Sequence, residues 1–205
     1  MRKNLIDLFF LELSKKTTKD VQIIVTGAVA GSLYGHSRPS LDIDFEIRPK
    51  KEKDSAYLEY LDGVIREISS RLKVDTNYGE DISHWSMIDY LDYRKKSIPY
   101  KKIGHLDIRL IAPEYWTIGK MTRFFRIDIQ DMIQVIKKKK LDAGESIGLW
   151  ARALKASPMS LAKRDFILHV KLFIHDHGRH AWGNGFDKKK ALDLFDRLVR
   201  SGRVV

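Results

Sequence analysis

The stretch VQIIVTGAVAGSLYGHSRPSLDIDFEI, residues 21–47, organises our interpretation of the chain. Its apolar, β-branched start (21–26) predicts a buried strand that stops at Gly27. Small residues then predict a short helix, and a polar loop follows at 35–40. A second apolar run at 42–48 predicts a second strand.

Two carboxylates lie in this second strand. Asp42 and Asp44 are two residues apart, so they project from one face of the strand while their apolar neighbours point to the other. Like charges side by side destabilise a sheet, and a hard cation such as Mg²⁺ relieves the repulsion because it binds carboxylate oxygens. An EF-hand calcium loop does not fit, because its sixth position holds Ile47 instead of glycine and its twelfth holds Lys53 instead of glutamate.

Together these features resemble the signature of the DNA polymerase β-like nucleotidyltransferase superfamily: a glycine after the first strand, a short helix, a second glycine, a loop, Ser or Thr, and Asp-x-Asp on a strand. The residues that match are Gly27, Ala30, Gly35, Arg38, Ser40, Asp42 and Asp44. The chain is most similar to the bacterial branch that includes type IV toxin–antitoxin nucleotidyltransferases, over residues 21–137. It departs from the pattern at Ala28, where the family usually has Gly or Ser.

The resemblance implies an activity: transfer of a nucleoside monophosphate from an NTP to an acceptor hydroxyl or phosphate. A third acid on a later strand completes the family's site, and Asp107 in HLDIRLI is the candidate, with Asp89 or Asp92 as replacements. Asp42, Asp44 and Asp107 would then be catalytic and would hold two Mg²⁺ ions, or Mn²⁺, with Asp107 as the base or the residue that positions it.

The resemblance also implies a set of nucleotide-binding residues around the phosphates. These are Gly27, Ala28, Ser32, Arg38, Ser40, Lys120 and Arg123. For Lys120 and Arg123 the alternative is a role in surface ion pairs along helices, which contribute little to stability.

The charge of the 205-residue chain favours polyanionic partners, since the net charge is +11 and the pI is about 9.7. The charge does not distinguish tRNA, DNA, a nucleotide or an acidic protein. The resemblance implies RNA (tRNA) or a protein as the acceptor, and a cognate toxin or antitoxin protein as a partner. The chain has no cysteine, which excludes disulfides and thiolate metal sites. Asp7 and Glu12 interrupt the apolar N-terminal segment, and no run is long enough to span a membrane, so we expect a cytoplasmic protein.

The fold expected is α/β (α+β): a small mixed sheet as the nucleotidyltransferase core, followed by helices. We expect the core with its following helices at 1–142 and a helical C-terminal region at 143–205. The expected segments are a crossover helix at 54–72, an irregular segment at 74–93 with a short strand and one turn of helix, a hairpin of 94–101 with 105–111, helices from 113, and a linker at 141–148.

Three alternatives remain open at this point. The first is a nucleotide-binding or partner-binding module on the same fold with weakened catalysis, which Ala28 favours because the family's hydroxyl is lost there. The second is a general RNA-binding protein, which rests on charge alone and lacks an aromatic platform for bases. The third concerns histidines 169–180, whose spacing matches no zinc pattern, so core or surface roles are favoured.

Overall fold

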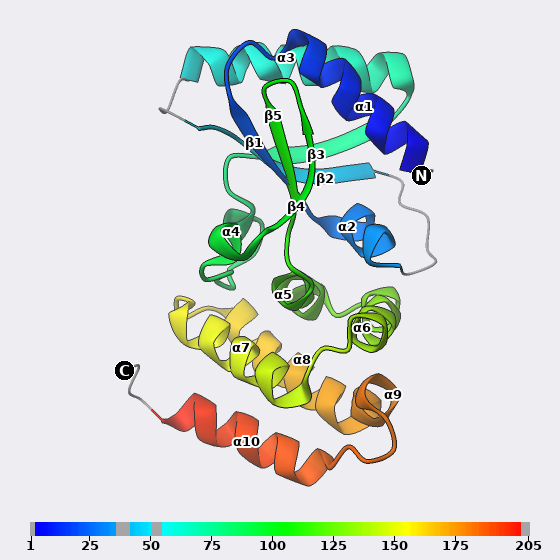
Figure 1. The fold of residues 1–205 in the computed structure, drawn as a ribbon. Helices are drawn as coiled ribbons and strands as arrows, with labels where there is room; N and C mark the ends of the chain where they lie inside the picture. Colours follow the sequence, from blue (N-terminus) through cyan, green and yellow to red (C-terminus); the bar gives the residue numbers. More distant parts are fainter. Residues whose placement is uncertain (1–2, 36–41, 51–54, 202–205) are drawn as a thin grey trace. The chain divides into compact units, whose positions relative to one another are not determined.

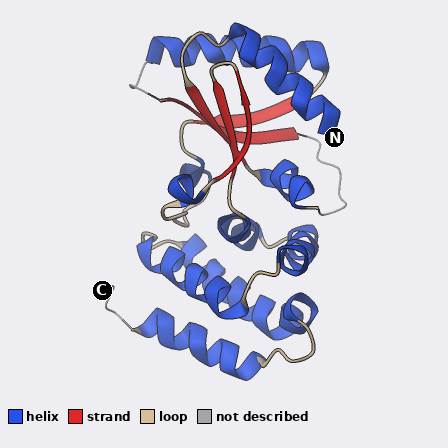
Figure 2. Cartoon of the chain, viewed as in Figure 1, coloured by secondary structure: helices blue, strands red, loops and turns tan. Residues whose placement is uncertain are grey.

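A computed structural model describes residues 3–35, 42–50 and 55–201. These residues divide into two compact units. The sheet unit comprises residues within 1–33, 37–82 and 94–112, and the helical unit comprises residues within 34–36, 83–93 and 113–205. The mixed α/β fold with a helical C-terminal region is confirmed (Figures 1 and 2).

The sheet unit is built on a five-stranded mixed sheet with the order β3-β2-β1-β5-β4. Strands β1 and β2 are antiparallel, as are β4 and β5, whereas β1 is parallel to β5 and β2 is parallel to β3. The elements of residues 3–110 are α1 (Lys3–Lys16), β1 (Val21–Val25), α2 (Gly27–Tyr34), β2 (Asp42–Pro49), α3 (Ser55–Leu72), β3 (Asp75–Gly79), the 3₁₀-helix η1 (Ile82–Trp85), α4 (Tyr93–Lys96), β4 (Ile98–Ile103) and β5 (Leu106–Leu110).

One face of this sheet is closed by an aromatic core under α1 and α3 (Figure 1). Phe9 and Phe10 of α1 each place their ring 6.0 Å from that of Phe45 on β2. Phe45 also stacks on Tyr78 of β3 at 5.3 Å. Because alternate residues of a strand face opposite sides, this packing turns the even-numbered residues of β2, including both predicted metal ligands, to the other face.

The helical unit continues the chain from residue 113. Its elements are α5 (Pro113–Arg123), α6 (Arg126–Lys139), α7 (Ala143–Ala156), α8 (Leu161–Leu172), the π-helical turn η2 (Phe173–His177), α9 (Gly178–Trp182) and α10 (Lys188–Arg200). Trp150, Phe166, Phe173 and Phe195 are fully buried in its core. The indole N–H of Trp150 donates to the Thr117 hydroxyl at 2.8 Å, which joins α7 to α5.

Two segment expectations are corrected, and a third is confirmed. The predicted linker at 141–148 is wrong: α7 begins at Ala143, and the Asp142 side chain caps it by accepting from the backbone N–H of Glu145 at 2.9 Å. The segment at 74–93 contains the short strand and the helical turn expected within it, β3 and η1. The predicted first hairpin strand begins only at Ile98, because residues 93–96 form α4. In addition, the division between the compact units does not follow the expected boundary at Ala143, since residues 113–142 belong to the same unit as the later helices.

Among the described residues, no helix combines the length and apolarity that crossing a membrane requires.

Candidate functional site

The two carboxylates of β2 share a hydrogen-bond donor. Asp42 and Asp44 point to the face of the sheet opposite the aromatic core, and the register pairs Asp44 with Asn77 on β3. The side-chain amide of Asn77 donates to Asp42 Oδ2 at 2.8 Å and to Asp44 Oδ1 at 3.1 Å. One neutral amide therefore holds two anionic groups together at the edge of the sheet.

A glycine turn borders the same carboxylates. Gly27 has a φ of +60°, a conformation that favours glycine, and a Cβ at this position would overlap the carboxylate of Asp44. The turn is fixed from the strand side, because the Thr26 N–H donates to the Asp44 backbone carbonyl at 2.8 Å. Helix α2 starts at Gly27, so the positive end of its dipole lies beside Asp44.

The structure describes two of the four other predicted phosphate-binding residues between positions 28 and 40, Ala28 and Ser32. Ala28 is buried in the first turn of α2. The Ser32 hydroxyl donates to the Val29 carbonyl of its own helix at 2.7 Å, so its proton is already committed. Arg38 and Ser40 lie outside the described residues.

The structure does not bring Asp107 to the carboxylate pair, which corrects the expected three-acid site. Asp107 is level with Gln22 of β1, whereas Asp44 lies beside Thr26. Four residues of strand separate those levels, about 13 Å at the rise of an extended strand. Asp107 faces the correct side of the sheet but lies toward its other end, where it forms an ion pair with Lys50 at 2.8 Å.

Two other charged residues on this face, Glu46 and Arg109, are engaged in structural contacts. Glu46, two residues beyond Asp44, is only 1% exposed. Its carboxylate accepts from Arg94 Nε at 2.7 Å and from the Ile82 N–H at 3.2 Å. Arg109 Nε donates to the Ser97 hydroxyl at 2.7 Å.

Sequence reasoning missed Asn77 and its neighbour Asp75. Asp75 is paired in register with Asp42 and, by the alternation of the strand, lies on the same face as Asn77. It is thus the acid next to the pair on the adjoining strand, although no group of three His, Cys, Asp or Glu side chains in the described ranges is arranged to hold a metal ion. The alternation D-T-N in residues 75–77 is the signal that could have revealed both residues.

Two predicted nucleotide-binding residues belong to an ion-pair network inside the helical unit. Lys120 is 2% exposed, and its ammonium group lies 2.8 Å from both Asp128 and Asp131. Arg123, with a side chain 55% exposed, contacts Asp128 at 2.8 Å. These contacts supply a structural role for both cations, and their binding of a nucleotide stays a prediction.

The acids considered as replacements for Asp107 also have local partners. Asp89 Oδ1 accepts from the backbone N–H of Leu91, and Asp92 Oδ1 accepts from the Tyr115 hydroxyl at 2.7 Å. That contact and the burial of the phenol raise the pKa of Tyr115 to about 12, burial being the larger cause. Both carboxylates therefore organise loop 83–93 of the helical unit.

The histidines of the C-terminal region take part in separate contacts. His169 stacks on Phe124 at 4.6 Å and its Nδ1 lies 2.9 Å from the Met121 carbonyl. His175 Nδ1 lies 2.6 Å from the carboxylate of Asp176. These placements agree with core and surface roles.

No protein-family model, no curated protein and no solved structure matches this chain.

Proposed function

We propose that this protein is a Mg²⁺-dependent nucleotidyltransferase that moves a nucleoside monophosphate from an NTP to an acceptor hydroxyl or phosphate. The observation that supports the proposal is the convergence of Asp42 and Asp44 on Asn77, directly beside the glycine turn that starts α2. A helix start provides backbone N–H groups for phosphate, and two adjacent carboxylates provide oxygens for a hard cation.

The chemistry of this donor set fits a divalent cation. Asp42 and Asp44 offer oxygen ligands, which Mg²⁺ and Mn²⁺ prefer, and the Asn77 amide that donates to both offsets part of the repulsion between them. A bound cation would oppose the same repulsion more strongly than the Asn77 amide does, because it carries a full charge. It would supply Lewis-acid stabilisation of the triphosphate and of the departing pyrophosphate.

Each residue then has a definite task. Asp42 and Asp44 would hold the cation, and the N–H groups at Gly27 and Ala28 would donate to phosphate oxygens at the start of α2. In the transfer, the acceptor oxygen bonds to the α-phosphorus, the bond from that phosphorus to the bridging oxygen breaks, and pyrophosphate leaves. The acceptor proton passes to water, since Asp107 is too far along the sheet to take it from this site.

Transfer is tested with purified protein, radiolabelled NTPs, Mg²⁺ and total tRNA. Label should appear on an acceptor with the parent protein and with Asp107→Asn, and should be lost with Asp42→Asn and Asp44→Asn. Absence of label with the parent, or equal labelling by the Asp42 and Asp44 variants, would remove the catalytic proposal.

A second candidate is a nucleotide-binding or partner-binding module of the same fold that does not transfer. The ion pair of Asp107 with Lys50 favours it, because a two-ion site would lack its expected third acid. Thermal unfolding separates binding from catalysis: Mg²⁺ with NTP should raise the Tm of either a binder or an enzyme, whereas only the enzyme labels an acceptor.

The acceptor and the biological partner belong to the same proposal. The net charge of +11 supports RNA, tRNA included, as the acceptor. A cognate toxin or antitoxin protein would be encoded beside this chain, so the product of the neighbouring gene should be co-purified and tested as an acceptor and as an inhibitor of labelling.

A further inference from the structure

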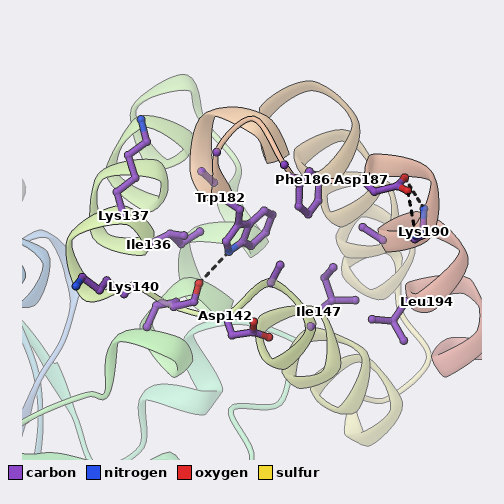
Figure 3. Close-up of a pocket in the computed structure, with 17 residues that line it drawn as sticks. Ile136, Lys137, Lys140, Asp142, Ile147, Trp182, Phe186, Asp187, Lys190 and Leu194 are labelled. Carbon is purple, nitrogen blue, oxygen red and sulfur yellow. Dashed lines mark hydrogen bonds and ion pairs between the residues drawn. The ribbon is translucent and has the colours of Figure 1, made fainter.

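The helical unit contains a cavity of about 790 Å³ that the proposed transfer does not use (Figure 3). It lies among the end of α6, the start of α7, α9, the 183–187 loop and the start of α10. Its volume falls within the usual range of about 300–1,000 Å³ for ligand sites. The apolar part of its lining includes Ile136, Ile147, Trp182, Phe186 and Leu194.

The aromatic wall of this cavity is held rigidly. Trp182 and Phe186 stack with their ring centroids 4.9 Å apart, and the Trp182 indole N–H donates to the Leu141 carbonyl at 3.0 Å. A Cβ at Gly178 would overlap the Phe186 ring, so the absence of a side chain at this position leaves room for the ring. A preformed wall lowers the ordering cost of binding.

Lysines surround the mouth of the cavity. Lys137, Lys140 and Lys190 border it and are exposed, and they belong to the runs 137–140 and 188–190. Figure 3 shows the amino groups of Lys137 and Lys140 directed away from the cavity, on the α6 side. These two lysines therefore place their charge outside the cavity on the α6 side, while the interior is largely aromatic and aliphatic.

The two carboxylates of the lining are compensated locally. Asp142 Oδ1 accepts from the Glu145 N–H at 2.9 Å, and Asp187 Oδ1 accepts from the N–H groups of Lys189 and Lys190 at 3.0 and 3.1 Å. Each therefore caps a helix, α7 or α10, whose positive dipole end opposes its charge. Lys190 also lies 3.8 Å from the Asp187 carboxylate. The lysines of the runs 137–140 and 188–190 outnumber these two carboxylates, so the surface beside the cavity carries net positive charge.

We infer that this cavity is a docking site for an acidic protein segment that inserts one large apolar side chain, with its carboxylates on the surrounding lysines. Interfaces commonly place an apolar anchor in a central pocket inside a polar rim. A small anion wholly inside the cavity would not reach amino groups that point outward, whereas a segment lying across the mouth would. A nucleobase is disfavoured, because the indole N–H is already used and the polar edge of a base would be buried against an aromatic and aliphatic wall.

The test selects random twelve-residue peptides, displayed on phage, against the full chain. Enriched peptides should carry net negative charge and one recurrent large apolar residue. Their binding, measured by fluorescence polarisation, should weaken about tenfold or more in Gly185→Leu, as expected for loss of a central anchor. Gly185 lines the cavity, and a Cβ there meets nothing within 4 Å, so the backbone accepts a side chain at this position of the lining.

Two matched controls distinguish a specific effect of changing the cavity or the lysines beside it from a general loss of peptide binding. Gly63→Leu adds the same side chain at another open glycine, on α3, and should leave binding unchanged. The triple change of Lys137, Lys140 and Lys190 to Glu should abolish binding, whereas the same triple change at exposed lysines of the sheet unit should not. Those control lysines are Lys95, Lys96 and Lys102.

Three results would overturn the inference. The first is that the selection enriches no peptide that binds the parent protein in preference to the Gly185→Leu variant. Another is that the enriched peptides are acidic but lack the apolar residue. The last is that a twelve-residue oligouridine binds the parent and loses affinity in Gly185→Leu, which would make the pocket a nucleobase site.

Discussion

Gly27 and Asp44 lie so close that a methyl group on the glycine would occupy the space of the aspartate's carboxylate. The glycine also has a φ of +60°, which a side chain would strain. The start of α2 and the carboxylate pair are therefore fitted to one another, and neither can be altered without moving the other.

The first prediction concerns this fit. Gly27→Ala should lower the free energy of unfolding by about 1–3 kcal/mol, through strained backbone and a displaced Asp44, and should abolish any rise in Tm caused by Mg²⁺. Denaturant unfolding with and without Mg²⁺ measures both effects. Gly63→Ala is the control: it lies in α3 with open space around it and should be neutral or slightly stabilising.

The second prediction concerns Asn77, which donates to both carboxylates. Asn77→Ala should cost about 1 kcal/mol without a cation, because the repulsion loses its compensating amide, and Mg²⁺ should restore part of that loss. Asn77→Asp should be less stable without metal and should bind Mg²⁺ more tightly, since a third carboxylate joins the pair. Calorimetric titration with Mg²⁺ checks the order of affinities; weaker binding by Asn77→Asp than by Asn77→Ala would exclude a cation at this place.

The sequence predicted much of this arrangement because its signals are local. The apolar run 21–26 and the alternation around Asp42 and Asp44 predicted β1 and β2, within one residue of each strand end. Asp107, which the resemblance assigned to the site, does lie on the same face of the sheet as Asp42 and Asp44. The sequence could not predict how far along β1 strand β5 is paired, and that register carries Asp107 to the level of Gln22.

Other parts were missed for different physical reasons. Strand β3 is short and polar, so residues 75–79 show no apolar alternation, and the local signal for Asn77 is its polar alternation with Asp75. The start of α7 did carry a local signal, Asp142 followed three residues later by Glu145, which is typical of a helix N-terminus. Asp142 and Asp187, which cap the cavity-lining helices α7 and α10, are 45 residues apart in the sequence, so the cavity itself is a property of packing.

The third prediction separates a structural from a ligand-binding role for the buried cation of the helical unit. Lys120→Met should lower stability by about 3–5 kcal/mol, because Asp128 and Asp131 would remain buried with one ammonium group fewer. Arg123→Met should cost about 1 kcal/mol or less, since that side chain is 55% exposed. Urea unfolding measures both; equal costs would show that the network does not depend on Lys120.

The fourth prediction concerns acid stability. The Lys15 and Arg71 side chains that hydrogen-bond to Glu12 lower the pKa of its carboxyl from 4.5 to about 2. A pKa that is lower in the folded than in the unfolded state stabilises the protein above the unfolded value, and the contribution is lost as pH falls toward 2. Glu12→Gln should therefore have a lower Tm than the parent at pH 7, and the two should converge near pH 2. A Tm difference that stays constant with pH would contradict the assignment; Glu59→Gln on α3 serves as the exposed control.

The central claim is that Asp42 and Asp44, without Asp107, hold a divalent cation. Its most direct test is titration of the protein with Mn²⁺, followed by electron paramagnetic resonance of the free ion. The parent and Asp107→Asn should bind Mn²⁺ with the same affinity, in competition with Mg²⁺, and Asp42→Asn and Asp44→Asn should not bind it. Binding that survives in Asp44→Asn, or that disappears in Asp107→Asn, would contradict the account.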